Sequence, residues 1–122
     1  AIDELSIPVV RLTKEIGVIP LVGEIDTHRA QILMENALKQ GNTYKLSWLI
    51  IDLSAVPIID TMVADQLFKV VAALKLIGID VVLSGIRSEI ALTMVQLGVK
   101  LNDIVTFNSL YGALDYTNSR MQ

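Results

Sequence analysis

The hydrophobic positions of this chain alternate between continuous apolar runs and runs with helical spacing. The runs at 48–53 and 80–85 are largely apolar, which is typical of parallel strands covered on both faces. Between them, residues 60–77 place apolar side chains three and four positions apart, which predicts a long amphipathic helix. The same patterns predict further strands at 8–12, 16–22 and, weakly, 104–106, and further helices at 26–39, 88–97 and 109–116.

Local signals set the connections between these elements. A charged turn at 13–15 separates the first two strands, and so short a connection predicts an antiparallel pair. Pro20 has no N–H to donate, so we expect it at a bulge or on an unpaired side of its strand. Gly41 with Asn42, and later Gly98, are expected to end helices. The result is a single α/β domain of order ββαβαβα(β)α, with a mixed and mostly parallel sheet.

This order brings three loops together. Strand–helix–strand crossovers are right-handed and place successive strands parallel, so their carboxyl ends share one edge of the sheet. The loops that carry Thr27, Thr61 and residues 85–88 should therefore meet at one end of the domain. Binding sites of open α/β sheets usually lie at that edge.

Two of these loops contain similar dipeptides, Asp26-Thr27 and Asp60-Thr61, each between a predicted strand and a predicted helix. A hydroxyl at a helix N-terminus is a good cap, and the same place is suited to holding a phosphate. The two interpretations are compatible, because a capping hydroxyl can also accept a phosphoryl group. Phosphorylation would add about −1.5 to −2 charges, which the helix terminus favours and the adjacent aspartate opposes.

Other polar and apolar residues allow two interpretations each. Arg87 is either a solvated loop residue or a counter-ion at the shared edge, and solvation is the default. Ser88 is expected to cap a helix rather than to accept a phosphoryl group. Met62, Phe68 and Leu76 on the long helix are either core residues or contact residues for a partner.

Composition excludes several classes of protein. The 122 residues are 52% hydrophobic, enough for one core and for apolar surface left over for a partner. Charged residues interrupt the apolar runs, Asp52 in one and Lys75 in another, so no stretch is long enough to span a bilayer. The net charge of −3 and the absence of a basic run argue against nucleic acid as a partner.

No arrangement of residues typical of an enzyme is found. The chain has no cysteine and a single histidine, His28, which excludes thiol sites and multi-histidine metal sites; we expect His28 exposed in a first helical turn. No glycine-rich phosphate loop or paired carboxylates at a catalytic spacing are present. We therefore expect a non-enzymatic protein without metal or cofactor. The acidic start of the chain shows no signal peptide, and a cytoplasmic location is expected.

Three segments resemble one known family. Residues 50–64, with the string Asp-Leu-Ser followed by Ile-Asp-Thr at Thr61, resemble the phosphorylation segment of STAS domains, and most resemble the carboxy-terminal domain of RsbR-type stressosome proteins. Residues 20–27, ending in Ile-Asp-Thr at Thr27, resemble a second signature of that group, and residues 85–91 a third. Departures from the family pattern are Ala55 in place of a frequent glycine and Ser88 in place of proline.

The resemblance implies a STAS fold and a specific role. It implies that Thr27 and Thr61 are phosphorylated by an RsbT-type serine/threonine kinase. From their adjacency to the acceptors, we expect Asp26 and Asp60 to help position each hydroxyl. The resemblance further implies co-assembly with RsbS-type proteins and other RsbR paralogues into a scaffold that sequesters the kinase. Stress would then release the kinase to control the general-stress sigma factor.

The same resemblance suggests how the chain is organised and which alternatives remain. Residues 1–122 would be a single STAS domain, and residues 1–6 the end of a linker from an N-terminal sensor domain. The edge with Gly85, Arg87 and Ser88 would face a partner. Two alternatives from other classes are a stand-alone anti-sigma-factor antagonist and the STAS module of an anion transporter.

Overall fold

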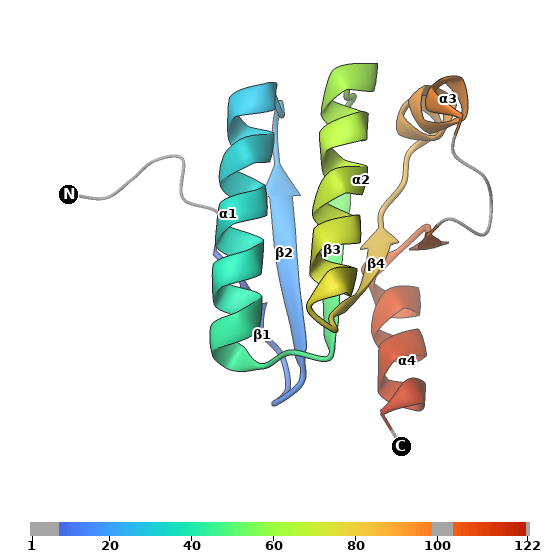
Figure 1. Ribbon diagram of the computed structural model, residues 1–122. Coiled ribbons are helices and arrows are strands. Elements are labelled where there is room, and N and C mark those ends of the chain that lie inside the picture. The colour runs from blue at the N-terminus through green and yellow to red at the C-terminus, as the bar shows by residue number, and fades with distance from the viewer. Residues whose placement is uncertain (1–7, 99–103, 122) are drawn as a thin grey trace.

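The computed structural model describes residues 8–98 and 104–121, which form one mixed sheet with helices on both of its faces (Figure 1). The proposed linker at 1–6 lies outside the described residues. The elements follow in the predicted order, namely β1 (Val10–Arg11), β2 (Ile16–Val22), α1 (Thr27–Tyr44), β3 (Trp48–Ala55), α2 (Thr61–Leu76), β4 (Asp80–Ser84), α3 (Ser88–Leu97), β5 (Val105–Phe107) and α4 (Leu110–Arg120).

The sheet has the topology that the sequence predicts. Its strands lie in the order β1-β2-β3-β4-β5, with β1 antiparallel to β2 and all other neighbours parallel. Strand β3 is central, and its residues 49–53 are all buried, because a strand between two neighbours and under both helical layers buries both of its faces. The register between β2 and β3 shifts between Pro20 and Val22, which confirms the bulge expected at the proline.

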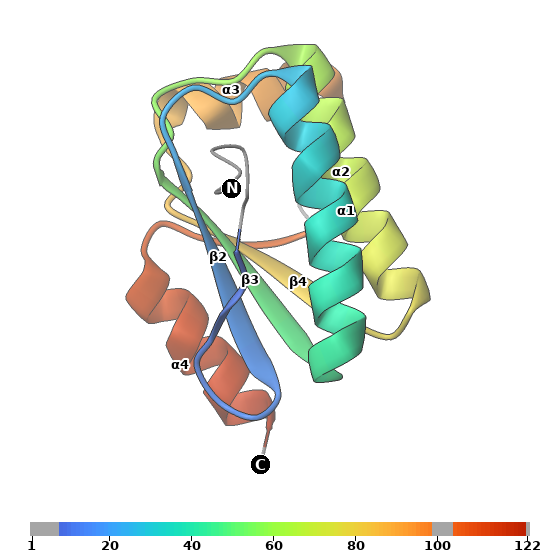
Figure 2. The ribbon, with the colours of Figure 1, turned by 90° about the vertical axis from the view of Figure 1, so that its left-hand side faces the viewer.

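The helices cover the two faces of the sheet unequally. Helices α1 and α2 lie side by side on one face, α4 lies on the other, and α3 crosses one end of the sheet (Figure 2). The larger core lies beneath α1 and α2 and includes Leu49, Ile51 and Leu53 of β3. Alternate residues of β3 face the other side, where Ile50 joins the smaller core beneath α4.

The end of α1 corrects one prediction. The helix does not end at Gly41 and Asn42 but continues to Tyr44, and Lys45 takes the left-handed conformation at its C-terminus with φ 54°. Gly41 is buried, and a Cβ there would lie 2.7 Å from Cδ1 of Ile79. This glycine therefore permits close packing against the segment that leads into β4 rather than ending the helix.

The C-terminal elements also differ from the prediction. Helix α4 continues to Arg120, four residues beyond the expected end at 116, because its last turns remain packed on the sheet. The ring of Tyr116 meets that of Trp48 edge to face with centroids 5.7 Å apart, and Thr117 is fully buried. Helix α3 has the predicted bounds and ends at Gly98, which has φ 93°.

Candidate functional site

Three loops meet at the carboxyl ends of the parallel strands, as the topology predicts. They are residues 23–26 after β2, 56–60 after β3, and 85–87 after β4, and we call this end of the domain the switch edge (Figure 1). The first loop is joined to the end of β3, just before the second loop, by the N–H of Gly23, which donates to the carbonyl oxygen of Ala55 at 2.9 Å. The third loop is joined to the same end of β3 by Nε of Arg87, which donates to the carbonyl oxygen of Ser54 at 3.3 Å.

Both threonines lie exposed at the first position of a helix, Thr27 on α1 and Thr61 on α2. The structure corrects the interpretation of the threonines as caps, because the aspartates before them are the N-caps. Oδ1 of Asp26 accepts a hydrogen bond from the N–H of Arg29, and Oδ1 of Asp60 accepts one from the N–H of Val63, both at 2.8 Å. A carboxylate therefore caps each helix, and the hydroxyl of the next residue is left exposed at the surface.

Ser88 is a second correction, since it does not cap α3. The N-cap is Arg87, which makes no side-chain capping bond, and Oγ of Ser88 donates instead to Oε1 of Glu89 at 2.9 Å. A backbone hydrogen bond lowers the pKa of Glu89 most, and the Ser88 hydrogen bond and the nearby Arg87 charge lower it further. Gly85 is buried with φ 72°, whereas Arg87 and Ser88 are exposed.

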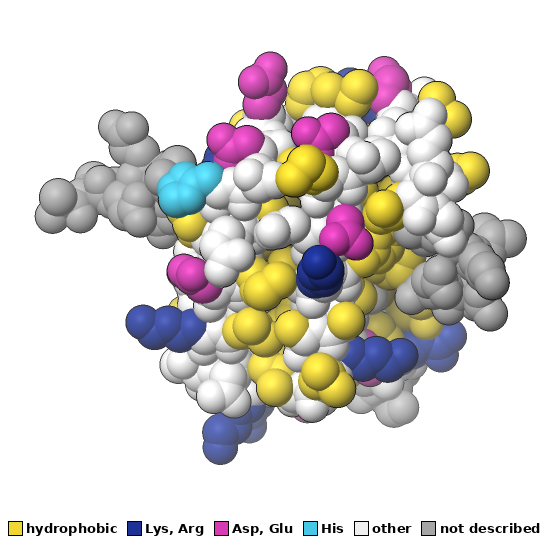
Figure 3. Space-filling view, turned by 45° about the horizontal axis from the view of Figure 1, so that its top comes forward, with side chains coloured by type: hydrophobic (Ala, Val, Ile, Leu, Met, Phe, Trp, Pro, Cys, Tyr) yellow, Lys and Arg dark blue, Asp and Glu magenta, His cyan; other side chains and the backbone are white. Residues whose placement is uncertain are grey.

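The switch edge combines acidic and apolar side chains (Figure 3). Exposed hydrophobic residues flank Thr61 on both sides: Ile58 is 58% exposed and Met62 is 67% exposed. Of the residues whose role the sequence left open, Leu76 is also exposed, whereas Phe68 packs against the main core. The lone histidine, His28, lies exposed in the first turn of α1 as expected.

Two buried polar contacts near this edge were missed by the sequence analysis. Asp52, at the carboxyl end of β3, accepts hydrogen bonds from Oγ of Ser54 and Oγ of Ser84. Thr93 of α3 donates to the carbonyl oxygen of Ile59, one residue before the cap of α2. An acid inside an apolar strand was a usable signal for the first contact, because a buried carboxyl group needs hydrogen-bond partners.

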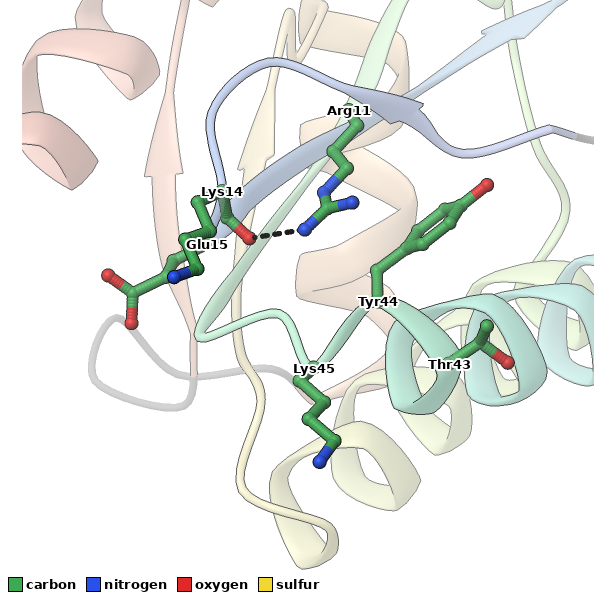
Figure 4. Close-up of a pocket in the computed structure, with 6 residues that line it drawn as sticks. All are labelled: Arg11, Lys14, Glu15, Thr43, Tyr44 and Lys45. Atoms are coloured by element: carbon green, nitrogen blue, oxygen red, sulfur yellow. Dashed lines mark hydrogen bonds between the residues drawn. The ribbon is translucent and has the colours of Figure 1, made fainter.

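The opposite end of the domain has a shallow hollow of about 520 Å³, lined by six residues (Figure 4). Its guanidinium, on Arg11, is already occupied: it lies 5.1 Å from the centre of the Tyr44 ring and donates to the carbonyl oxygen of Lys14 at 3.2 Å. The charged ends of Glu15 and Lys45 point away from that guanidinium. The charges of this hollow therefore do not converge on one point.

The described residues contain neither a metal-binding cluster nor a membrane-spanning helix. Within 8–98 and 104–121, no group of three or more acidic or histidine side chains is placed to hold a metal ion. None of the helices in the described part of the chain is both long and apolar enough to cross a membrane.

Comparison with known proteins identifies relatives over nearly the whole domain. The chain is 53% identical to the RsbT co-antagonist protein RsbRD of Bacillus subtilis and 50% identical to RsbRB of the same organism, over 93% of its length in both cases. It spans only 41% of the length of each of these relatives.

A solved structure shows the same fold. An RsbS variant of Moorella thermoacetica superposes with a TM-score of 0.79 at 24% identity, covering 95% of this chain and 98% of that one. The family pattern of the STAS domain matches residues 8–113, and the fold expected from the three sequence segments is confirmed. The chain therefore belongs to the STAS domain family.

Proposed function

We propose that this chain is the phosphorylation-switched STAS domain of an RsbR-type stressosome protein, which sequesters and releases an RsbT-type serine/threonine kinase. One observation carries the proposal: Thr27 and Thr61 are exposed at equivalent helix starts on one edge of the sheet. Relatives that are about half identical across the domain are named RsbT co-antagonists. The domain acts as a substrate and a binding surface, not as a catalyst.

The geometry explains how a phosphate could change this surface without unfolding the domain. Because Asp26 and Asp60 cap the helices, modification of the threonine hydroxyls removes no structural hydrogen bond among the described residues. A phosphate at the first helical position lies beside free N–H groups and the positive end of the helix dipole. Two phosphates together add about −3 to −4 charges to the edge, so the modified surface differs strongly in charge from the unmodified one that a partner would bind.

The partners follow from the same arrangement. The kinase would bind the switch edge, where Gly85, Arg87 and Ser88 adjoin the Thr61 loop and where Ile58 and Met62 offer exposed apolar surface. Helix surfaces away from this edge would contact RsbS-type proteins and RsbR paralogues in a cytoplasmic oligomer. Release of the kinase would then activate the general-stress sigma factor.

Phosphate mapping by mass spectrometry tests the proposal. Wild type, Thr27→Ala and Thr61→Ala are incubated with an RsbT-type kinase and ATP, with Thr43→Ala as the matched control. Thr43 is an exposed threonine at the opposite end of α1. We expect phosphate at Thr27 and Thr61, loss of one site in each switch variant, and the wild-type pattern in the control. A kinase that modifies a control substrate but neither threonine here would contradict the proposal.

Size-exclusion chromatography separates the proposal from the alternative of a stand-alone anti-sigma-factor antagonist. The domain is mixed with an RsbS-type protein, and each protein is also run alone. Co-elution in a large particle supports a stressosome scaffold. Elution of both proteins as small separate species favours the antagonist.

A further inference from the structure

The two threonine loops are held in place by different parts of the molecule. The loop before Thr27 is held by the helix that follows it. Nη1 of Arg29 on α1 donates to the carbonyl oxygens of Val22 at 3.0 Å and Glu24 at 2.7 Å. The loop before Thr61 is bound from α3, because Oγ1 of Thr93 donates to the carbonyl oxygen of Ile59 at 3.1 Å. Among the described residues, only the second loop thus depends on a side chain from a helix other than its own.

The contact made by Thr93 is buried and close to the acceptor. Thr93 is 8% exposed and Ile59 is 4% exposed, so water competes little for this hydrogen bond. Ile59 immediately precedes the cap residue Asp60, and its carbonyl belongs to the peptide plane that leads into the cap. The same hydroxyl lies 3.1 Å from the carbonyl oxygen of Glu89, so its single proton serves either its own helix or the Thr61 loop.

Helix α3 is also fixed to the strand that leads into the Thr61 loop. The left-handed Gly85 lies against Ser54, with no room for a side chain, and Arg87 donates to the Ser54 carbonyl oxygen. The outer face of α3 is apolar and open, with Leu92 60% exposed and Val95 68% exposed. The Thr93 hydroxyl therefore connects α3 directly to the residue before the cap of α2.

We propose that Thr93 is a positioning residue that holds the Asp60-Thr61 start of α2 for phosphorylation and makes Thr61, but not Thr27, sensitive to the position of α3. This inference rests on the proposed function for its phosphorylation readout. Phosphoryl transfer depends on accurate placement of the acceptor, so a loosened loop is a poorer substrate. Thr27 provides an internal control in the same molecule.

Three variants test the proposal. Thr93→Val removes the hydroxyl at nearly constant volume, and Thr93→Ser restores it. Thr117→Val is the matched control, because Thr117 is buried on α4 and its hydroxyl binds only the carbonyl of Leu114 in its own helix among the described residues.

Hydrogen exchange gives a readout that needs no kinase. The amides of Val63 and Ala64, in the first turn of α2, are compared with those of Arg29 and Ala30, which make the equivalent bonds to Asp26. In Thr93→Val we expect exchange at Val63 and Ala64 to rise about threefold to tenfold relative to the α1 pair, the range for loss of one hydrogen bond. We expect Thr93→Ser and Thr117→Val to leave this ratio unchanged. An equal change in both pairs would show global destabilisation and overturn the inference.

Phosphorylation kinetics give the second readout. With an RsbT-type kinase and ATP, we expect Thr93→Val to lower the rate at Thr61 about threefold to tenfold relative to the rate at Thr27, with rescue by Thr93→Ser. Phosphate at both sites with an unchanged ratio would overturn the role of Thr93. Absence of phosphate at both sites in the wild type would instead overturn the proposed function, and with it the role of Thr93 in phosphorylation. The hydrogen-exchange ratio would still decide whether Thr93 holds the Thr61 loop.

Discussion

Ser84 on β4 donates a hydrogen bond of 2.7 Å to Asp52 on β3, across the register position where the two strands pair. The other carboxyl oxygen of Asp52 accepts a hydrogen bond of 2.5 Å from Ser54. Asp52 is 7% exposed, and the backbone of Ser54 in turn receives the Arg87 contact. A buried carboxyl group thus joins the central strand β3 to its neighbour β4 at the point where the switch edge begins.

Replacement of Asp52 should cost stability in proportion to the hydrogen bonds lost. In Asp52→Ala both hydroxyls lose their acceptor in a buried site, and we expect the free energy of unfolding to fall by about 2–4 kcal/mol. Asp52→Asn keeps one acceptor oxygen and nearly the same shape, so its loss should be about half as large. Urea denaturation followed by circular dichroism measures both. Equal losses in the two variants would contradict this expectation, because they would show that the acceptor oxygen kept by asparagine contributes nothing to stability.

Gly85 should be the least replaceable of the left-handed glycines. A Cβ at Gly85 would lie 2.5 Å from the backbone N of Ser54, whereas at Gly98, which also has positive φ, it would meet nothing within 4 Å. Gly98→Ala therefore bears only the conformational cost of about 1 kcal/mol, and Gly85→Ala bears the clash as well, for a loss of about 3 kcal/mol or more. Thermal unfolding of the two variants compares them directly. Similar melting temperatures would contradict the contact with Ser54.

Most of this fold was predictable because its signals are local. Apolar runs and helical spacing gave every element in order, and the short turn at 13–15 gave the antiparallel start. The end of α1 was not predictable, because what makes Gly41 a packing residue is Ile79, which lies on a different part of the chain. A single sequence contains no signal for such a contact.

The candidate site was predictable to a similar degree. The topology placed Thr27 and Thr61 at one edge. Which residue of each Asp-Thr pair caps the helix could be decided only from the side-chain geometry. The contact of Thr93 with Ile59 could not be predicted for another reason. A threonine in a helix commonly hydrogen-bonds to a backbone carbonyl of the preceding turn, and nothing in the sequence shows that this one also reaches a loop.

Glu89 should make stability depend on pH in the acidic range. Its pKa is lowered from 4.5, first by its backbone hydrogen bond and then by Ser88 and Arg87. A group whose pKa is lower in the folded state stabilises the protein above its unfolded pKa, and this contribution is lost as the pH falls through the folded pKa. We therefore expect the unfolding free energies of wild type and Glu89→Gln to differ at neutral pH and to converge on acidification.

Urea denaturation at a series of pH values measures this difference. Glu35→Gln is the control, since Glu35 is an exposed carboxylate in the middle of α1 rather than at a helix start. A difference between wild type and Glu89→Gln that stays constant or grows as the pH falls would rule out the expected linkage.

The aspartates before the two threonines should affect phosphorylation by capping the helices, that is, by accepting hydrogen bonds from backbone N–H groups. Oδ1 of Asp60 binds the N–H of Val63, so the carboxylate fixes the helix start that carries Thr61. Asparagine is as good an N-cap as aspartate, whereas alanine removes the cap at a cost of about 1 kcal/mol. We expect Asp60→Asn to retain both the stability of the wild type and its rate of Thr61 phosphorylation. Asp60→Ala should lower both.

Thr61→Ala separates the cap from the acceptor. Because the Thr61 hydroxyl does not cap α2, this variant should unfold within about 0.5 kcal/mol of the wild type while losing the phosphate at that site. Stability is measured by urea denaturation and phosphate by mass spectrometry, on the same preparations. If Asp60→Asn kept its stability but lost phosphorylation at Thr61, the negative charge itself would be required by the kinase. Capping alone would then not explain why an aspartate precedes each threonine, since asparagine would serve the helix equally well.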